Sequence, residues 1–299
     1  MADSQKQTRE QEEEARKAVE LLHQARATLA DGIAEAGGGN RAILRLTDEE
    51  LAVIDSEPMD ERLVPSPHLA KLPEDQRDTA IATALRSLVS RELIEVANIE
   101  QIDELIRQQE AAEARGETLN ERAPIDIRVA EEAALVLSLR GSAERVLAAD
   151  LTTSDDTSHA FVYIHAADLF LVERVTGGGM HLFTLTNTPQ SAADLVQALV
   201  DPFGVADTEG PAQQLSPDAL DRDSVPRSVR RVIDTALVVG QLMVLSDSEG
   251  ALVTTYATGK EVMTVTVDEP HSPKGIVAQN LSTKALHRKI TKLLKLPKQ

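Results

Sequence analysis

The order of expected elements repeats once in the C-terminal two thirds of the chain, and this repeat constrains the fold more than any other feature. Each copy has an apolar helical stretch, four short strand-like runs and a closing helix. In the first copy these are Val129–Leu139, then Arg145–Leu151, His159–Ile164, Leu169–Val175 and Met180–Leu185, and finally Ser191–Val200. In the second they are Val229–Leu237, then Gln241–Leu245, Leu252–Tyr256, Glu261–Asp268 and Gly275–Gln279, and finally Leu281–Leu296. Because internal repeats set architecture before local detail does, we expect two similar halves with a pseudo-two-fold relation.

The connections within each copy are short, which favours antiparallel pairing, since parallel neighbours need a long crossover. We therefore expect an α+β fold with two quasi-repeated, mainly antiparallel sheet-plus-helix units and a helical N-terminal region. In chain order we expect a long N-terminal helix with a glycine break, a small mostly helical region, the first α+β repeat, a Pro- and Gly-rich linker and the second α+β repeat. Their bounds are 1–40, 41–124, 125–200, 201–227 and 228–299.

The N-terminal segment predicts one long helix over Ser4–Ala36, because strong helix formers dominate it. A narrow apolar stripe runs through Leu22, Ala25 and Leu29, and no apolar face precedes Ala15. A helix of this length is only marginally stable alone in water, so the stripe should pack on the body of the protein or on another chain. We expect the helix to be an interaction element rather than part of the main core, with these three residues binding a partner or a second copy in a homo-oligomer.

A basic stripe near the C-terminus is the second candidate for partner binding. Lys284, Arg288, Lys292 and Lys295 recur at steps of four, four and three, so they share one helical face. Three interpretations stay open. The stripe is a solvated face with cations near a helix C-terminus, or it pairs with the acidic body of the same protein, or it binds an acidic partner or phosphate.

No motif indicates a catalytic, cofactor or metal site. The chain has no Cys, which removes thiolate metal sites and thiol catalysis. Gly177–Gly179 lies between two strand-like runs, so a hairpin tip is favoured over a phosphate-binding loop. None of the histidines forms a metal-type pair at helical spacing with a nearby acid, and we expect all of them to be ordinary surface or edge residues. They are His23, His68, His159, His165, His181, His271 and His287.

The charge and hydropathy of the chain narrow the possible partners. The net charge of −18 repels phosphate backbones and argues against general nucleic-acid binding. No apolar run is long enough for a signal peptide or a bilayer span. We therefore expect a cytoplasmic protein without a membrane span, whose partner is another protein.

The segment from Leu44 to Ile54 predicts a strand and then a helix that begins with a capping box of Thr47 and Glu50. A Pro-rich turn follows at Pro65–Pro73, and then a helix that ends in the sequence Ala84–Ile94. With the two sheet-plus-helix units, this order over Arg41–Leu296 resembles the type VII secretion-associated chaperone family, EspG-like, of mycobacteria and related actinobacteria.

The resemblance implies a cytosolic, noncatalytic protein that holds a helical secretion substrate and keeps it soluble. The long acidic N-terminal helix and the insert at 201–227 depart from the family pattern. A chaperone-like binding role is therefore the leading hypothesis. Two alternatives are a structural component that assembles through its N-terminal helix and an enzyme acting in the cleft between the copies.

Overall fold

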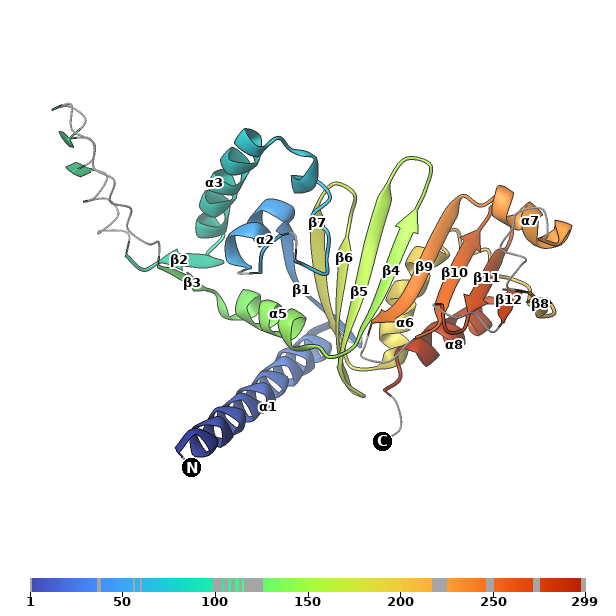
Figure 1. Ribbon diagram of the computed structural model, residues 1–299, viewed down its shortest axis with the longest axis horizontal. Coiled ribbons are helices and arrows are strands. Elements are labelled where there is room, and N and C mark those ends of the chain that lie inside the picture. The colour runs from blue at the N-terminus through green and yellow to red at the C-terminus, as the bar shows by residue number, and fades with distance from the viewer. Residues whose placement is uncertain are drawn as a thin grey trace.

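A large antiparallel sheet is the framework of the protein in the computed structural model (Figure 1). The structure describes residues 2–36, 39–55, 57–59, 61–98, 104, 107, 108, 111, 112, 115, 126–216, 225–245, 250–270 and 275–296. The ten strands lie in the order β1-β7-β6-β5-β4-β9-β10-β11-β12-β8. Their bounds are β1 (Asn40–Thr47), β4 (Val146–Thr152), β5 (Thr157–Ala166), β6 (Leu169–Val175), β7 (Met180–Thr186), β8 (Gln213–Leu215), β9 (Val238–Leu245), β10 (Leu252–Ala257), β11 (Val262–Val267) and β12 (Ile276–Asn280). The expected α+β class is confirmed.

The strands of the two expected repeats meet in the centre of this sheet. β4 pairs antiparallel with β9, from Val146 opposite Leu245 to Thr152 opposite Val239. From that pair the strands of each copy run outward in chain order, as β4-β5-β6-β7 on one side and β9-β10-β11-β12 on the other. The equal order agrees with the expected repeat, while superposition of the halves stays a prediction. The two units share one sheet.

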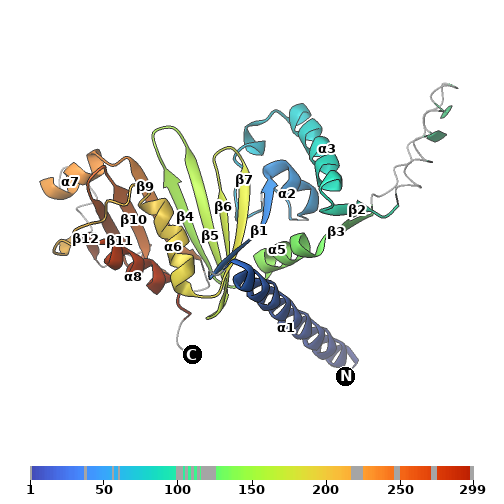
Figure 2. The same ribbon diagram turned by 180° about the vertical axis from the view of Figure 1, so that it is seen from behind.

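Two helices cover one face of the sheet, α6 (Pro189–Val200) and α8 (Thr283–Leu293) (Figure 2). Both begin at a side-chain cap that binds a free backbone N–H of the first turn. Thr188 caps α6 by accepting from the N–H of Ser191, and Ser282 caps α8 by accepting from the N–H of Ala285. The expectation that Ser191 itself opens α6 is wrong, since Pro189 already occupies the first helical turn.

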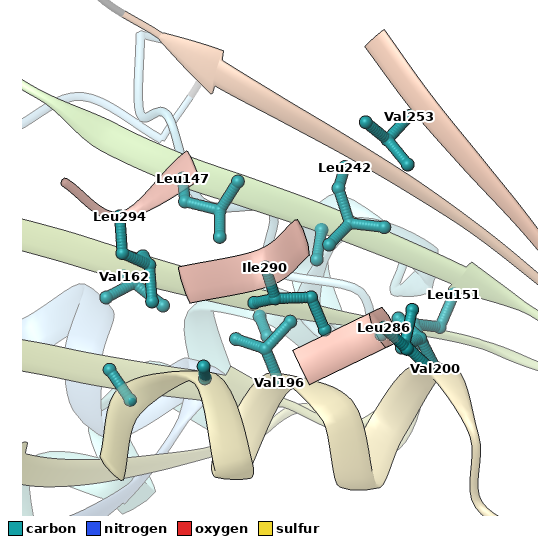
Figure 3. Packing of buried hydrophobic residues seen from close by; sticks show 14 of the residues in the cluster. Leu147, Leu151, Val162, Val196, Val200, Leu242, Val253, Leu286, Ile290 and Leu294 are labelled. Atoms are coloured by element: carbon teal, nitrogen blue, oxygen red, sulfur yellow. The ribbon is translucent and has the colours of Figure 1, made fainter. Parts of the chain in front are cut away.

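The core beneath these helices draws on both halves of the chain (Figure 3). Leu147 of β4 and Leu242 of β9 lie in one cluster with Val196 of α6 and Ile290 of α8. All four side chains are buried. Their burial stabilises the contact between the halves by roughly 1.5–3 kcal/mol for each side chain.

The other face of the sheet carries helices only toward its two ends, among the residues that the structure describes. At one end, a second cluster joins β1, β7, β6 and β5 to the C-terminal half of α1 (Ala2–Ala36), to α2 (Asp48–Ile54) and to α5 (Glu131–Ser142). At the other end, α7 (Arg227–Asp234) packs on β10, β11 and β12. The helix α3 (Glu74–Ser90) packs on α2, and the turn η1 (Leu69–Lys71) precedes it. We call α2, η1 and α3 the helical cap.

Two short strands were not expected from the sequence. The segment 201–227, expected to be a linker, contributes β8, which pairs with Ile276–Ala278 of β12 and closes one edge of the sheet. β3 (Ile127–Val129) pairs with β2 (Ile94–Val96) in a separate two-stranded sheet. The helix expected from Asn98 to about Ala114 lies mostly outside the described residues, as does the short helix expected at Ser216–Asp218.

Candidate functional site

The middle of the sheet is open on the face opposite α6 and α8. Along β9, burial alternates with the period of two that a strand imposes on its side chains. The residues directed toward α6 and α8 are buried, and they are Val238, Gly240, Leu242 and Val244. The residues between them are half-buried or exposed, and they are Val239, Gln241, Met243 and Leu245. The second set belongs to the uncovered face, which we call the open strip over β4, β9 and the adjoining parts of β5 and β10.

An apolar row crosses the open strip from strand to strand. The register places Phe161, Ala148, Met243, Leu252 and Val267 in successive lateral positions of β5, β4, β9, β10 and β11. Met243, in the centre of the row, is 40% exposed, which is high for a large apolar side chain in a sheet interior. Ala148, Leu252 and Val267 are half-buried. The row therefore offers apolar surface that the described helices leave accessible.

The next row across the same strands is polar. His159, Asp150, Gln241 and Thr254 follow one another on β5, β4, β9 and β10. His159 Nδ1 lies 2.6 Å from Asp150 Oδ1, and the His159 ring stacks on Phe161 with centroids 6.4 Å apart. Asp150 and Gln241 are exposed. The open strip thus combines an apolar row with hydrogen-bonding groups along one border.

Helices on both sides give the open strip its walls (Figure 1). α5 packs beside Phe161 and Tyr163 of β5, and α7 packs beside Tyr256 and Val265 at the opposite end. Between these helices the strip is accessible. The strip can bury apolar side chains of a partner, and His159 and Asp150 provide an imidazole and a carboxylate at its border.

A buried ionic cluster, which we call the buried joint, lies beside α5. Its members are contributed by α2, the residues after it, α5, β5, β6 and β7, and they are Asp48, Asp55, Arg140, Tyr163, Glu173 and His181. His181 bridges two carboxylates, with Nε2 2.8 Å from Asp48 Oδ1 and Nδ1 2.7 Å from Glu173 Oε1. All three of these side chains are fully buried. The joint ties the helical cap to the sheet.

The remaining contacts of the joint satisfy the other carboxylate oxygens. Glu173 Oε2 accepts from the Tyr163 hydroxyl at 2.7 Å and from Arg140 Nε at 2.9 Å. Arg140 also donates to Asp55 Oδ2 at 2.6 Å. Asp48 Oδ2 accepts from the backbone N–H groups of His68 and Leu69, at 2.7 and 3.0 Å. Buried charges need partners of this kind, because an unpaired one is strongly destabilising.

The charges in the joint shift the protonation equilibria of its members. Burial alone would raise the pKa of Glu173, but Arg140 and His181 outweigh it and hold that pKa below its usual value. Burial opposes the charged form of His181 as well, yet its bonds to Asp48 and Glu173 raise its pKa. The pKa of Tyr163 is raised well above its usual value by burial and by Glu173. These directions make Glu173 an anion at neutral pH and favour the protonated form of His181.

A cavity of about 580 Å³ borders the joint. Arg140, Asp55 and Tyr163 form part of its wall, together with Leu63 and Leu137. His181 is not among the residues that line it, and both of its ring nitrogens already contact carboxylates. General-base catalysis needs a free nitrogen within reach of a substrate proton. The geometry therefore favours a structural role for His181, which links Asp48 of α2 to Glu173 of β6, over a catalytic one.

The structure places the apolar stripe of α1 against the protein itself. Ala25 and Leu29 are buried in the same cluster as β1, β7 and α5, and Leu22 packs at its border. Arg26 on the neighbouring face forms an ion pair with Asp168, with Nη2 and Oδ1 2.7 Å apart. Of the two alternatives left by the sequence, packing on the body is the one observed. The expectation that this stretch of α1 lies outside the core is wrong, because it covers the edge of the sheet at β1 and β7.

The basic stripe is exposed along one face of α8 and just beyond its C-terminal end. The side chains of Lys284, Arg288, Lys292 and Lys295 all face outward. Arg288 lies 4.0 Å from Glu209, which joins the stripe to the acidic body at one point. Lys284 and Arg288 also border a groove of about 890 Å³ between α6 and α8. Binding of an acidic partner by this face stays a prediction.

One histidine is not the surface or edge residue expected from the sequence, since His181 is fully buried in the joint. His165 is half-buried, and burial lowers its pKa to about 4. The polar residues of the joint carry one sequence signal, since Glu173 interrupts the apolar run Leu169–Val175 of β6. Its partners could not be identified because they lie on distant segments of the chain. Glycines 177–179 form the hairpin tip between β6 and β7, as expected.

Within the described part of the chain, no group of three or more His, Asp or Glu side chains has an arrangement suited to a metal ion. None of the described helices combines the length and the apolar character that a bilayer span requires. Neither a scan against protein-family models nor a search of curated protein sequences finds a match for this chain.

Proposed function

We propose that this is a noncatalytic, cytoplasmic protein that binds an α-helical segment of another protein across its open strip. The observation that carries the proposal is the apolar row through Ala148, Met243 and Leu252, which lies between α5 and α7. Accessible apolar surface with polar groups at its border is typical of protein-binding sites.

The dimensions of the strip suit a helix that lies across the strands. Neighbouring strands are about 4.8 Å apart and a helical turn rises about 5.4 Å, so one apolar side chain per turn meets one strand after another. From β5 to β10 the strip covers three strand spacings, about 14 Å, which a helix of about 10 residues spans. Asp150 at the border favours Lys or Arg on the partner, as does the net charge of −18. We therefore expect an amphipathic helix with basic residues beside its apolar face.

A chaperone-like role for a secretion substrate is the specific form of this proposal. A binding strip that covers an amphipathic helix keeps that helix from aggregating before export. The role also agrees with the resemblance to the EspG-like family and with the lack of any catalytic motif in the sequence. A cytoplasmic location is supported by the Cys-free composition, which is suited to a reducing compartment.

Site-specific crosslinking in the native cell tests the proposal. A photoreactive amino acid at Met243 should capture one polypeptide, and mass spectrometry should place the crosslink in an amphipathic helix. The matched control is the same amino acid at Val89 of α3, which is apolar and 43% exposed but lies outside the strip. Met243→Glu should then weaken binding of the identified helix at least about tenfold, equal to about 1.4 kcal/mol, while Val89→Glu leaves it unchanged. Equal capture at both positions would refute binding at the strip.

Assembly through α1 is the second candidate, and the projection of its N-terminal end from the body supports it (Figures 1 and 2). Val19, which precedes the packed stripe of α1, is 64% exposed. If α1 assembles the protein, sedimentation should give an oligomer that removal of residues 1–20, which stops short of the packed part of α1, converts to a monomer. A monomer at all concentrations would leave the binding role as the better account.

A further inference from the structure

We infer that His181 holds a proton that locks the helical cap onto the sheet, and that raising the pH releases this joint. This release is a property of the protein alone and does not depend on partner binding. The donors and acceptors of the buried joint determine it.

The hydrogen-bond requirement at His181 points to the doubly protonated ring. A neutral imidazole has one N–H donor and one acceptor nitrogen, whereas imidazolium donates from both nitrogens. Both nitrogens of His181 lie 2.7–2.8 Å from carboxylate oxygens, one on Asp48 and one on Glu173. With neutral His181, one of these contacts would place a nitrogen lone pair against an anionic oxygen. Only the imidazolium satisfies both.

The surroundings of the two carboxylates keep this proton on His181. Asp48 Oδ2 accepts two backbone N–H groups, and Glu173 Oε2 accepts from Arg140 and Tyr163. Donors of this kind stabilise the anionic form of a carboxyl group. The pKa values of both carboxyl groups are accordingly lowered, although burial opposes the shift.

The charges that face His181 from the surrounding elements balance only when it is protonated. The carboxylates are Asp48 of α2, Asp55 after α2 and Glu173 of β6. The permanent cations are Arg140 of α5 and Arg62, which lies 3.7 Å from Asp55. Tyr163 of β5 donates as a neutral hydroxyl, and the pair of His68 with Glu49 lies behind Asp48. Apart from the more exposed pair of His68 and Glu49, three anions therefore meet two permanent cations, and protonated His181 supplies the third.

The helical cap is the part that should loosen when this proton is lost. Of the two carboxylates that contact His181, Asp48 belongs to the helical cap and Glu173 lies within the sheet. Asp48 also bonds the backbone of η1 at Leu69, and Glu50 of α2 binds Arg91 at the end of α3. Because the cap is one connected unit, loss of the His181–Asp48 bond weakens its attachment as a whole.

The sign of the effect follows from the raised pKa of His181. The contribution of His181 to stability is complete below the ordinary histidine pKa of about 6.5. It is lost as the pH rises through the folded-state pKa of His181. Amide hydrogen exchange in α2 and η1, corrected for intrinsic base catalysis, should therefore accelerate at least about tenfold as the pH rises from about 6.5 through the folded-state pKa. Exchange in α8, on the opposite face of the sheet, should show no such acceleration.

Nitrogen-15 NMR of the full chain tests the inference directly, because it reports the protonation of each ring nitrogen. We expect His181 to carry both protons at about pH 7.5, one unit above the ordinary histidine value. His159→Gln is the matched control, since His159 contacts a single, exposed carboxylate at 2.6 Å. His181→Gln should abolish the pH dependence of cap exchange, and His159→Gln should leave it intact.

A second readout keeps the test decisive if His181→Gln does not fold. Glu173→Gln removes one of the two anions, so the midpoint of the His181 titration should fall toward the ordinary value. Detection of neutral His181 at about pH 7.5 would overturn the inference. So would equal acceleration of exchange in α2 and α8.

Discussion

Gly179, at the tip of the β6–β7 hairpin, determines how closely the helical cap approaches the sheet. Its φ of +77° lies in the left-handed region, which residues with a Cβ adopt only with strain. Its carbonyl accepts from the N–H of Asp48 at 2.9 Å. A Cβ at this position would lie 2.8 Å from Asp48 Oδ2 and 2.7 Å from His68 Cβ. The buried joint therefore depends on the absence of a side chain at one residue outside it.

Replacement of this glycine should destabilise the protein. Gly179→Ala combines backbone strain with a collision against Asp48, and we expect it to lower the free energy of unfolding by about 2 kcal/mol. Gly178→Ala is the matched control, because the nearest atom to its added Cβ would lie 3.9 Å away. Urea unfolding of the two variants measures the difference. Equal midpoints would show that the hairpin tip can move without loss.

Carboxylates of the helical cap and of the buried joint should make the folded state less stable as the pH falls into the acid range. The pKa values of Asp48, Glu50 and Glu173 are lowered by their partners in spite of burial. Their contribution is present above the ordinary carboxyl range and is lost as the pH falls through the folded-state values. Unfolding midpoints measured at decreasing pH should therefore drop in acid.

Glu50→Gln should make that drop shallower, because it removes one of the three groups. It also breaks a contact of 2.6 Å with Arg91 and should lower stability by about 1–3 kcal/mol at neutral pH. Glu95→Gln, at an exposed position of β2, serves as the control. An unchanged acid slope in Glu50→Gln would remove that residue from the explanation.

Local residue patterns were predictable and the buried joint was not. The capping box of Thr47 and Glu50 is present as expected, because its two hydrogen bonds involve residues three apart. His181 and Asp48 are 133 positions apart in the chain, and they meet only because β1 and α2 lie beside β7. No spacing rule connects such residues. The same holds for the open strip, since its rows depend on the register of β4 with β9.

At the scale of elements, α1 has two parts with different roles. Its C-terminal half supplies Ala25 and Leu29 to the core beside β1 and β7. Its N-terminal part projects from the body (Figure 1). The sequence pattern predicted that the first turns carry no apolar face, but it did not show which surface the stripe of α1 contacts. Burial begins at Leu21, since residues 16–20 are exposed.

Substitution within α1 distinguishes these parts. Leu29→Ala should lower the free energy of unfolding by about 2–3 kcal/mol, because it leaves a cavity in a packed cluster. Val19→Ala, on the exposed part, should change it by less than about 0.5 kcal/mol. Thermal unfolding provides the comparison. An unchanged midpoint in Leu29→Ala would restore the expectation that this helix is not part of the main core.

Elements of five or more residues were predictable from their patterns, whereas β3 and β8 were not. Each of these two strands has three residues, too few for a period of two to be recognised. β8 contains Gln213, Gln214 and Leu215, which carry no strand signal of their own. It forms because the edge of β12 offers unpaired backbone groups. The expected linker therefore completes the sheet.

For the whole molecule, the central β4–β9 pair joins the two halves into one cooperative unit. One core cluster contains Leu147 of β4, Leu242 of β9 and Val253 of β10, together with side chains of α6 and α8 (Figure 3). Two independent domains would instead have separate clusters and a boundary that few contacts cross. We therefore expect the halves to unfold in one transition.

Adjacent residues on opposite faces of β9 test this cooperativity. Leu242→Ala opens a cavity beneath α6 and α8 and should lower the free energy of unfolding by about 2–5 kcal/mol. Met243→Ala, on the open strip, should cost less than about 1 kcal/mol, because its side chain is already partly in water. In Leu242→Ala, amide protection should fall equally in β6 and β11, which lie on opposite sides of the central pair. Loss of protection in β11 alone would mean that the halves unfold separately, and the shared sheet would then be a contact between two domains.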